Sequence, residues 1–345
     1  MKTKILALSV LATLLASCGS DEPTPRVDDD DVVQVKSEEN RTVLIGASDG
    51  KVYNMQGGAV YATLPGCTAI TNMTMHGEDY YASGTTDNGT LTYWSNGRAV
   101  PLSGSGSTVD IVRVHDEIYA LGSDGTLYAN GTASTSLTQG DPAAIVRNSR
   151  GYGVACNTSG GIVWKIGSTS STTSQANAHA TSADLVSTAA ATTFNLAGYT
   201  QQVVNGQQTY TPCLWLNGSA NAMTLDINHS EREQNNHTYS SGQVMDVAHN
   251  GQTIIAVGNR SGGNTQVATV WLTSASDDVD DAKTYWQADG NVTASAVRVL
   301  VYGGDIYVMT VEHNHDTDAW CTRIWMNHQL KGTVGGIVGR GFVVI

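Results

Sequence analysis

Residues 296–330 read AVRVLVYGGDIYVMTVEHNHDTDAWCTRIWMNHQL, and this stretch decides the fold. It begins with an alternating apolar run that meets a tight turn at Gly303–Gly304, followed by a second β-rich run from Ile306 to Val311. A polar loop, EHNHDTDA, precedes a third run, CTRIWMNH, which turns at Asn327–His328 into a short final strand. Short alternating strands separated by turn residues predict an all-β unit.

The third run of this unit recurs upstream and gives seven copies. They are KVYNMQGG (51–58), LTYWSNG (91–97), TLYANG (126–131), IVWKIG (162–167), CLWLNG (213–218), TVWLTS (269–274) and RIWMNH (323–328). A period of about 40 residues, with four strands per copy and no helical segment, predicts a β-propeller of seven four-stranded blades. The fifth and sixth copies are less regular, so six or eight blades also fit the pattern.

Both ends of the repeat region carry partial units. Residues 42–64 begin at the first or second strand of a blade, and the C-terminal VGGIVGRGFVVI looks like the first two strands of another. A closed propeller must fasten its last blade to its first, and C-terminal strands that complete the N-terminal blade remove two open edges. We therefore expect Gly335–Ile345 to join residues 42–64 in one blade, and residues 42–345 to form the propeller.

The connections predict two unequal faces. Turns between the first and second strands are short, and those between the third and fourth are often Asn-Gly, which suits a type I′ hairpin. The other connections are long at 168–185, 198–212, 226–242, 274–292 and 311–320. Because successive strands run up and down, the long connections emerge together on one rim, the long-loop face, opposite a short-turn face. Loops on a rigid scaffold usually carry the binding site.

Composition narrows the possible partners. The chain has 345 residues, only 14% of them charged, and a formal net charge of −13. An acidic chain repels phosphate backbones, so nucleic acid is not an expected partner. Residues Gly46–Gly50 match G-x-S-x-G but read as a tight hairpin between strands, and no Gly-rich phosphate loop precedes a helix, so neither a nucleophile nor a cofactor is predicted.

The first 18 residues, MKTKILALSVLATLLASC, read as a targeting segment. Two lysines precede an apolar stretch that has the pattern of a signal peptide and is too short to span a bilayer. Leu15–Cys18 resembles the lipobox of bacterial lipoproteins, in which the cysteine becomes the lipidated first residue. The resemblance implies a signal peptide over 1–17 and acyl chains such as palmitate on Cys18. An ordinary secreted protein with a chance cysteine is the alternative.

Residues 18–41 are polar, acidic and contain proline, which predicts a flexible tether. Gly19 differs from the Asp of inner-membrane retention signals, and Asp21–Glu22 resembles the surface-export signal of lipoproteins from Bacteroidota. These resemblances imply a lipid-anchored protein of the outer membrane, displayed on the cell surface. The membrane would then be a partner through the anchor, and the protein a monomer or a subunit of a surface complex.

The repeat itself resembles that of propeller lipoproteins found in Bacteroidota, which pair G-x-[DE]-x-Y-x-x-G with a later W-x-N-G. The best matches are GEDYYASG with YWSNG, HDEIYALG with LYANG, and NLAGY with LWLNG. The resemblance covers about residues 42–345 and implies the fold and the location. It brings no catalytic residues.

The aromatic residue of each third run recurs at one position, which predicts packing between blades rather than sugar stacking. These residues are Tyr53, Trp94, Tyr128, Trp164, Trp215, Trp271 and Trp325. Candidate ligand-binding residues lie instead in the long connections. They are Tyr199 and Tyr210 in 198–212, His229 and His237 in 226–242, and His313, His315 and Asp316 in 311–320.

Two of these connections also carry residue types that bind metals. Carboxylates at Asp277, Asp278, Asp280 and Asp281 could hold Ca²⁺, but the run lacks the glycine and alternating spacing of a calcium loop. His313 and His315 lie two apart and point the same way in a strand, yet no third histidine follows at a fixed spacing. A solvated loop is the alternative in both cases.

These observations favour a non-catalytic binding module that takes a glycan or a protein on the long-loop face. The alternative is a glycan-active enzyme with carboxylate and histidine residues on the same face.

Replacing Cys18 by serine removes the thiol that would carry the lipid. We expect the Cys18→Ser protein to leave the membrane fraction of expressing cells, whereas the parent chain sediments with it. A variant that still fractionates with membranes would contradict lipid anchoring at this residue.

Overall fold

The computed structural model describes most of the chain beyond its N-terminal segment. The described residues are 35–114, 116–136, 140–148, 151–166, 169–172, 176–187, 192–216, 219, 221–228, 238–251, 253–263, 265–274, 281–286 and 291–345. Apart from strands they contain one short 3₁₀ turn, η2 (Glu38–Asn40). In this part of the chain no helix is long and apolar enough to cross a membrane.

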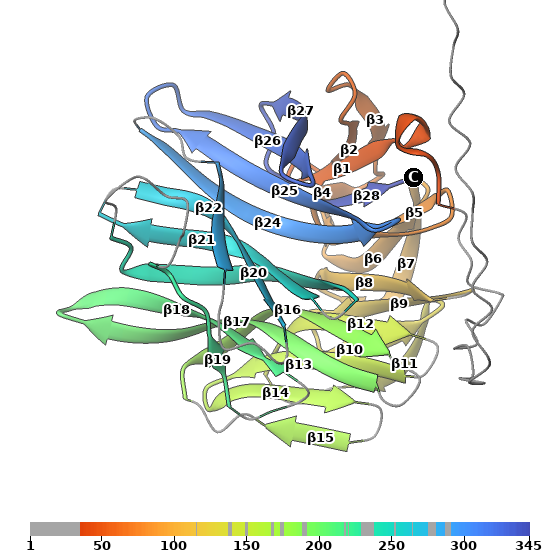
Figure 1. Ribbon diagram of the computed structural model, residues 1–345. Helices are drawn as coiled ribbons and strands as arrows, with labels where there is room; N and C mark the ends of the chain where they lie inside the picture. The colour runs from red at the N-terminus through yellow and green to blue at the C-terminus, as the bar shows by residue number, and fades with distance from the viewer. Residues whose placement is uncertain are drawn as a thin grey trace, which may run out of the picture. The chain divides into compact units, whose positions relative to one another are not determined.

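The described strands form seven four-stranded antiparallel sheets in a ring, which is a seven-bladed propeller (Figure 1). Blade 1 is β28 (Gly339–Val344), β1 (Val43–Ala47), β2 (Lys51–Asn54) and β3 (Val60–Thr63). Blade 2 is β4 (Cys67–His76), β5 (Asp79–Thr86), β6 (Thr90–Ser95) and β7 (Arg98–Ser105). Blade 3 is β8 (Thr108–Val114), β9 (Glu117–Gly122), β10 (Thr126–Ala129) and β11 (Thr132–Ser136).

The remaining four blades follow in chain order. Blade 4 is β12 (Asp141–Asn148), β13 (Gly151–Thr158), β14 (Gly161–Ile166) and β15 (Thr169–Thr172). Blade 5 is β16 (Ala178–Ser187), β17 (Thr192–Val204), β18 (Gln207–Trp215) and β19 (Met223–Thr224). Blade 6 is β20 (Ser241–Asn250), β21 (Thr253–Gly262), β22 (Thr265–Ser274) and β23 (Asp281–Trp286). Blade 7 is β24 (Val292–Tyr302), β25 (Asp305–Asn314), β26 (Ala319–Met326) and β27 (Gln329–Gly335).

This arrangement confirms the prediction of seven four-stranded blades. The predicted connections 168–185 and 274–292, however, contain the outer strands β15 and β23, and the first also contains most of the inner strand β16. An outer strand pairs with the sheet along one edge only, so it needs little apolar patterning. The all-polar TSST of β15 therefore gave no strand signal in the sequence.

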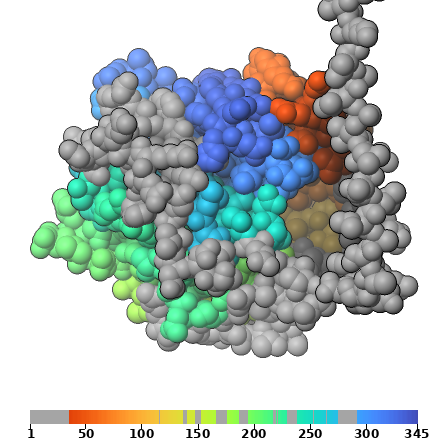
Figure 2. Space-filling view, viewed as in Figure 1, coloured from red at the N-terminus to blue at the C-terminus, as the bar shows by residue number. Residues whose placement is uncertain are grey.

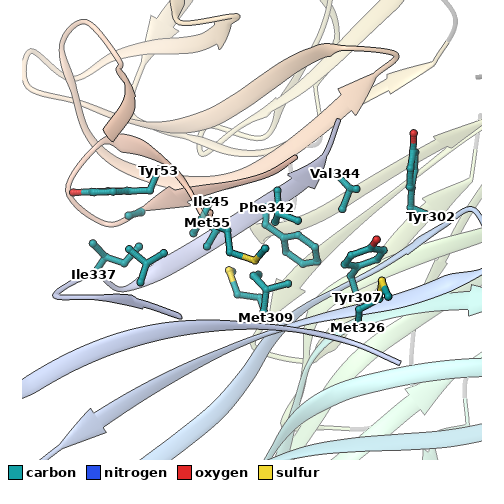
Figure 3. Packing of buried hydrophobic residues seen from close by; sticks show 14 residues of the cluster. Ile45, Tyr53, Met55, Tyr302, Tyr307, Met309, Met326, Ile337, Phe342 and Val344 are labelled. Atoms are coloured by element: carbon teal, nitrogen blue, oxygen red, sulfur yellow. The ribbon is translucent and has the colours of Figure 1, made fainter. Parts of the chain in front are cut away.

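The ring closes as predicted, but through a single C-terminal strand. β28 pairs antiparallel with β1, so the chain's tail supplies the innermost strand of blade 1. Phe342 and Val344 of β28 join a buried cluster with Met309 and Tyr307 of blade 7 (Figure 3). The closing strand is therefore held both by its ladder and by apolar packing against the last blade.

The turn between the third and fourth strands explains why an acidic residue and a later asparagine recur in the repeat. In blade 7, Asn327 and His328 have φ of 47° and 68°, the left-handed values of a type I′ turn. The Asn327 side chain accepts from the Ile306 amide at 2.9 Å and donates to Asp305 at 2.7 Å. Asn96 makes the same pair of bonds in blade 2. The repeated acidic residue and the later asparagine thus fasten one hairpin to the next.

A β-bulge recurs in the innermost strands. In blades 5 and 6 it follows Ala180 and Val244, and each of these residues faces a glycine of the neighbouring strand. A Cβ on Gly198 would lie 1.8 Å from the His179 carbonyl oxygen, and one on Gly258 would lie 1.9 Å from that of Gln243. The repeated glycine of the second run therefore makes room for the bulge.

Residues just after the bulges connect the blades at the centre of the ring. Asp246 of blade 6 accepts from the Ser182 hydroxyl of blade 5 at 2.5 Å and from the Val299 amide of blade 7 at 2.9 Å. Asp110 accepts in the same way from Asn72 and Ile145. Burial raises the pKa of both carboxyls, while Arg298 and the donated hydrogen bonds oppose that rise.

The third-run aromatics are buried between blades, as predicted. The most exposed of them is Tyr53, at 9%, and Trp94, Trp215 and Trp271 are each 0% exposed. Trp94 shares a cluster with Leu44 and Val52 of the preceding blade. Its indole N–H also donates to the Pro65 carbonyl at 3.0 Å. The indole N–H of Trp271 donates to the Asp226 backbone carbonyl at 2.8 Å. The core aromatics therefore also anchor the connections between blades.

Deleting residues 335–345 removes β28 and opens both blade 1 and the ring. Phe342, Val343 and Val344 are buried, and losing such side chains costs roughly 2–4 kcal/mol each. The sum is comparable to the roughly 5–15 kcal/mol that stabilises a whole domain. We expect the truncated chain to lose its cooperative thermal unfolding transition by circular dichroism, whereas an unchanged melting curve would refute closure by β28.

Candidate ligand-binding face

A long β-hairpin projects from blade 5 on the long-loop face (Figures 1 and 2). The sequence predicted a loop at 198–212, but these residues continue β17 and β18, whose ladder extends to Val204 and Gln207. Asn205 and Gly206 form the turn, with φ of 52° and 77°. Alternating Thr, Gln and Val residues suit a two-sided exposed ribbon, which explains why no buried-strand pattern marked it. Val203, near the tip, is 69% exposed.

Three rings stack along the base of this hairpin. His179 of β16 lies parallel to Tyr199 with 5.2 Å between ring centroids. Tyr199 meets Tyr210 edge to face at 5.1 Å, and the Tyr210 hydroxyl donates to Gln208 Oε1 at 3.0 Å. Burial, followed by the neighbouring Tyr210, raises the pKa of the Tyr199 phenol. The structure thus brings together the two predicted tyrosines and fixes the orientation of Tyr210.

Tyr210 also lines a groove of about 440 Å³ between the hairpin and the rim of blade 6. The hairpin forms one wall, and the rim ends of β20, β21 and β22 form the rest. The lining residues are Gln207, Gln208, Thr209, Tyr210, Ser240, Ser241, Gln243, Asn259, Ser261, Gly262, Gly263 and Gln266. None of these described lining residues is charged.

Hydrogen bonds fix the groove's walls to the ring. The Tyr210 amide donates to Ser241 Oγ at 2.9 Å, which ties the hairpin to the inner strand of blade 6. Gln266 and Asn259 donate to Ser295 Oγ of blade 7 at 2.7 and 3.3 Å. Side chains held in this way lose little rotational freedom when a ligand arrives.

A buried arginine positions the connection beside the groove. Arg260 has an exposed fraction of 0%, and its Nη1 donates to the Ile227 carbonyl at 3.1 Å. Its guanidinium lies 4.5 Å from the centroid of the Tyr239 ring, and its Nε donates to Thr269. The two described ends of the blade 5–blade 6 connection, at Ile227 and Tyr239, are therefore both held by one side chain.

A second aromatic cluster lies at the tip of the β25–β26 hairpin in blade 7. His313 stacks on Trp320 with ring centroids 4.2 Å apart and an interplanar angle of 11°. His315 meets His313 edge to face at 4.4 Å, and Asp318 binds His313 Nε2 at 2.8 Å. Trp320 is 40% exposed. The exposed Trp320 ring, supported from behind by His313, is a surface on which a sugar or a side chain can stack.

Asp316 has a structural role at this tip. It accepts a hydrogen bond from the Asn291 side chain at 2.8 Å, and its own amide donates to Asn314. His315 donates its amide to the Asn291 carbonyl at 2.8 Å. The hairpin tip is thereby tied to the connection that leads into β24.

The other predicted residues are placed only in part. Cys18, His229, His237, Asp277, Asp278 and Asp280 lie outside the described residues. Asp281 is the first residue of β23. Within the described ranges no three His, Cys, Asp or Glu side chains are grouped so that they could hold a metal ion.

Glu312 is the buried carboxylate closest in sequence to this cluster. Its side chain is 3% exposed and lies 3.3 Å from Arg323. Burial raises its pKa, and Arg323 opposes that rise. A carboxylate enclosed in this way is not exposed to a ligand at the hairpin tip.

Trp320, Ser241, Gln243 and Gln266 are not among the site residues that the sequence predicts. Trp320 could have been found, because it lies outside the repeated core position and its strand partner is His313. The groove residues gave no signal, since amides and hydroxyls in exposed strands fit any solvated surface.

No protein-family model matches the chain, and no curated protein matches its sequence. It is similar in fold to a quinoprotein alcohol dehydrogenase-like protein from Bacteroides thetaiotaomicron, covering 88% of this chain and 77% of that one at 10% identity, with a TM-score of 0.52. AztD from Citrobacter koseri matches over 88% and 98% at 10% identity, with a TM-score of 0.44. The six-bladed lectin of Aleuria aurantia matches over 76% and 92% at 12% identity, with a TM-score of 0.36. Such distant likeness shows the fold alone.

Replacing Arg260 by lysine keeps the charge but cannot reproduce the stack and both hydrogen bonds. We expect faster amide exchange at Tyr239–Ser241 and a loss of about 1–3 kcal/mol in unfolding free energy. The exposed Arg98→Lys, at the start of β7, is the control and should change neither quantity. Unchanged exchange in Arg260→Lys would show that this side chain does not hold the connection.

Proposed function

We propose that this protein is a non-catalytic binding module for a glycan or a protein, carried on the outer surface of a bacterial cell by a lipid on Cys18. The observation that carries the proposal is the concentration of ligand-type features on the long-loop face. That face holds two aromatic clusters, one with Tyr210 and one with Trp320, and a groove whose described lining is polar and uncharged.

The point where the chain enters the propeller supports an orientation in which the long-loop face points away from the membrane. Residues 35–41, part of the predicted tether, pack on the short-turn face: the Lys36 amide donates to the Tyr302 hydroxyl at 3.5 Å. Arg41 pairs with Asp305 at 2.5 Å and is 9% exposed. Hydrogen bonds from Arg41 and then Asn327 hold the pKa of Asp305 below its ordinary value. A tether leaving from this face would turn the long-loop face away from the membrane.

A groove of about 700 Å³ on the short-turn face is a less suitable ligand site. It lies between the N-terminal segment and blades 1 and 7, and its lining includes Glu38, Arg41 and Lys331. Lys331 binds Glu38 at 2.7 Å, so these charges already pair with each other or with the ring. In the proposed orientation this groove would also face the membrane.

The glycan-cleaving alternative is favoured by one specific observation, the hydrogen bond between His313 and Asp318. A histidine oriented by a carboxylate can act as a general base. If the protein cleaves glycans through this pair, reducing ends will accumulate from a polysaccharide panel and His313→Ala will stop their release. If the protein binds glycans but does not cleave them, the cleavage alternative is wrong and the binding role is retained.

The binding role is tested by removing features from the long-loop face alone. One variant deletes Gln201–Val204 and Gln207–Tyr210, which keeps the Asn205–Gly206 turn and the pairing of Thr200 with Thr211. A second is Trp320→Ala. The purified proteins are compared on an array of plant, microbial and mucin glycans and a set of purified glycoproteins.

We expect at least one of these changes to abolish the binding seen with the parent protein. Lys331→Ala, on the short-turn face, is the control and should bind normally. Binding that survives both long-loop changes combined, or that is lost in Lys331→Ala, would contradict the proposed face.

A further inference from the structure

We propose that the groove between blades 5 and 6 is a subsite for neutral carbohydrate, with the ring of Tyr210 as its stacking surface. This inference rests on the proposed binding function and assigns one ligand class to one place on the long-loop face. The groove's volume of about 440 Å³ lies within the range of small-molecule sites, roughly 300–1,000 Å³.

The groove's polar groups match those of a sugar. Its described lining holds five amide side chains, Gln207, Gln208, Gln243, Asn259 and Gln266, and four aliphatic hydroxyls, Thr209, Ser240, Ser241 and Ser261. Each amide offers both a donor and an acceptor, and each hydroxyl can do either. A sugar hydroxyl likewise donates and accepts, so a ring of them can satisfy these groups without an unpaired partner.

Because the described lining carries no charged side chain, we expect the ligand to be neutral. Among the described lining residues an anionic sugar would lose hydration without meeting a lysine or arginine, and a cationic ligand would meet no carboxylate. The chain's net charge of −13 adds a repulsive field for anions. Uronate and sulfated glycans should therefore be excluded, while neutral hexose and pentose units should not be.

Tyr210 is held in place before any ligand binds. Tyr199 supports the ring edge to face at 5.1 Å, and the Tyr210 hydroxyl donates to Gln208. The aliphatic face of a sugar can pack on such a ring without displacing it. A fixed ring costs little conformational entropy on binding.

The groove's hairpin wall does not suit an added peptide strand. Strand addition needs free backbone donors along an edge. On the β18 edge facing blade 6, the Tyr210 amide is already taken by Ser241, and Pro212 has no amide hydrogen. The blunted edge and the lack of aliphatic side chains in the described lining favour a glycan over a peptide.

The test uses the purified protein on an array of neutral and acidic oligosaccharides, followed by calorimetry with the strongest neutral binder. Tyr210→Ala removes the ring, whereas Tyr210→Phe keeps the ring and removes only the hydroxyl. Gln266→Ala removes one amide from the opposite side of the groove. Tyr61→Ala changes a tyrosine of blade 1 that is 51% exposed and serves as the matched control.

We expect neutral glycans to bind, and Tyr210→Ala and Gln266→Ala to weaken them by about tenfold or more, the scale of one lost contact of this kind. Tyr210→Phe should stay within about threefold of the parent, and Tyr61→Ala should be unchanged. Melting temperatures of all variants check that each one folds.

Two results would overturn the subsite. One is binding of acidic glycans only. The other is binding of neutral glycans that is unchanged in both Tyr210→Ala and Gln266→Ala. In the second case, loss of binding in Trp320→Ala would leave the proposed function standing on blade 7. Failure of every long-loop variant to alter binding would overturn both.

Discussion

The pairing of β28 with β1 is the constraint on which the other blades depend. A propeller blade buries its faces only against neighbours, so an open ring would expose two apolar sheets at once. β28 brings Phe342 and Val344 against Met309 of blade 7 while completing the ladder of blade 1. Around the centre, Asp110 and Asp246 each accept hydrogen bonds from both flanking blades. The blades are therefore held together by non-covalent contacts as well as by the chain that links them.

This closed ring determines where variation can occur. The bulges lie in the inner strands, and the turns that join the third and fourth strands form the short-turn face, so neither region can change without disturbing a ladder. The long-loop face carries the remaining freedom, and there the β17–β18 hairpin and the β25–β26 tip project aromatic and neutral polar groups. These segments are still fixed at their bases, through Ser241 to the hairpin and through Asn291 to the tip. A rigid support with individually anchored projections suits recognition more than large conformational change.

Local patterns predicted the blade and its number well, because the blade is a local structure. Trp94 and its equivalents, and the Asn327 turn, have a physical role within one hairpin or its neighbour and so recur at readable spacing. The site is different in kind. Tyr210, Ser241 and Gln266 come together because blades 5 and 6 pack face to face, which places the blade 5 hairpin beside the rim of blade 6. No spacing records that juxtaposition, and polar strand residues carry no pattern that separates a groove from an ordinary surface. The predicted tyrosines were placed correctly on the face, whereas the loop assigned to 198–212 was wrong because a two-sided ribbon lacks a buried face.

Native-state hydrogen exchange of β28 tests closure most directly. Amides that open only with the whole domain exchange at the rate set by global unfolding. The account predicts that the amides of Val343 and Ile345, which face β1 in the ladder, exchange as slowly as those of Val308 and Met309 in blade 7, with the same dependence on denaturant. Exchange of β28 through a faster local opening, while β25 stays protected, would show that the ring holds together without its closing strand and would contradict the account.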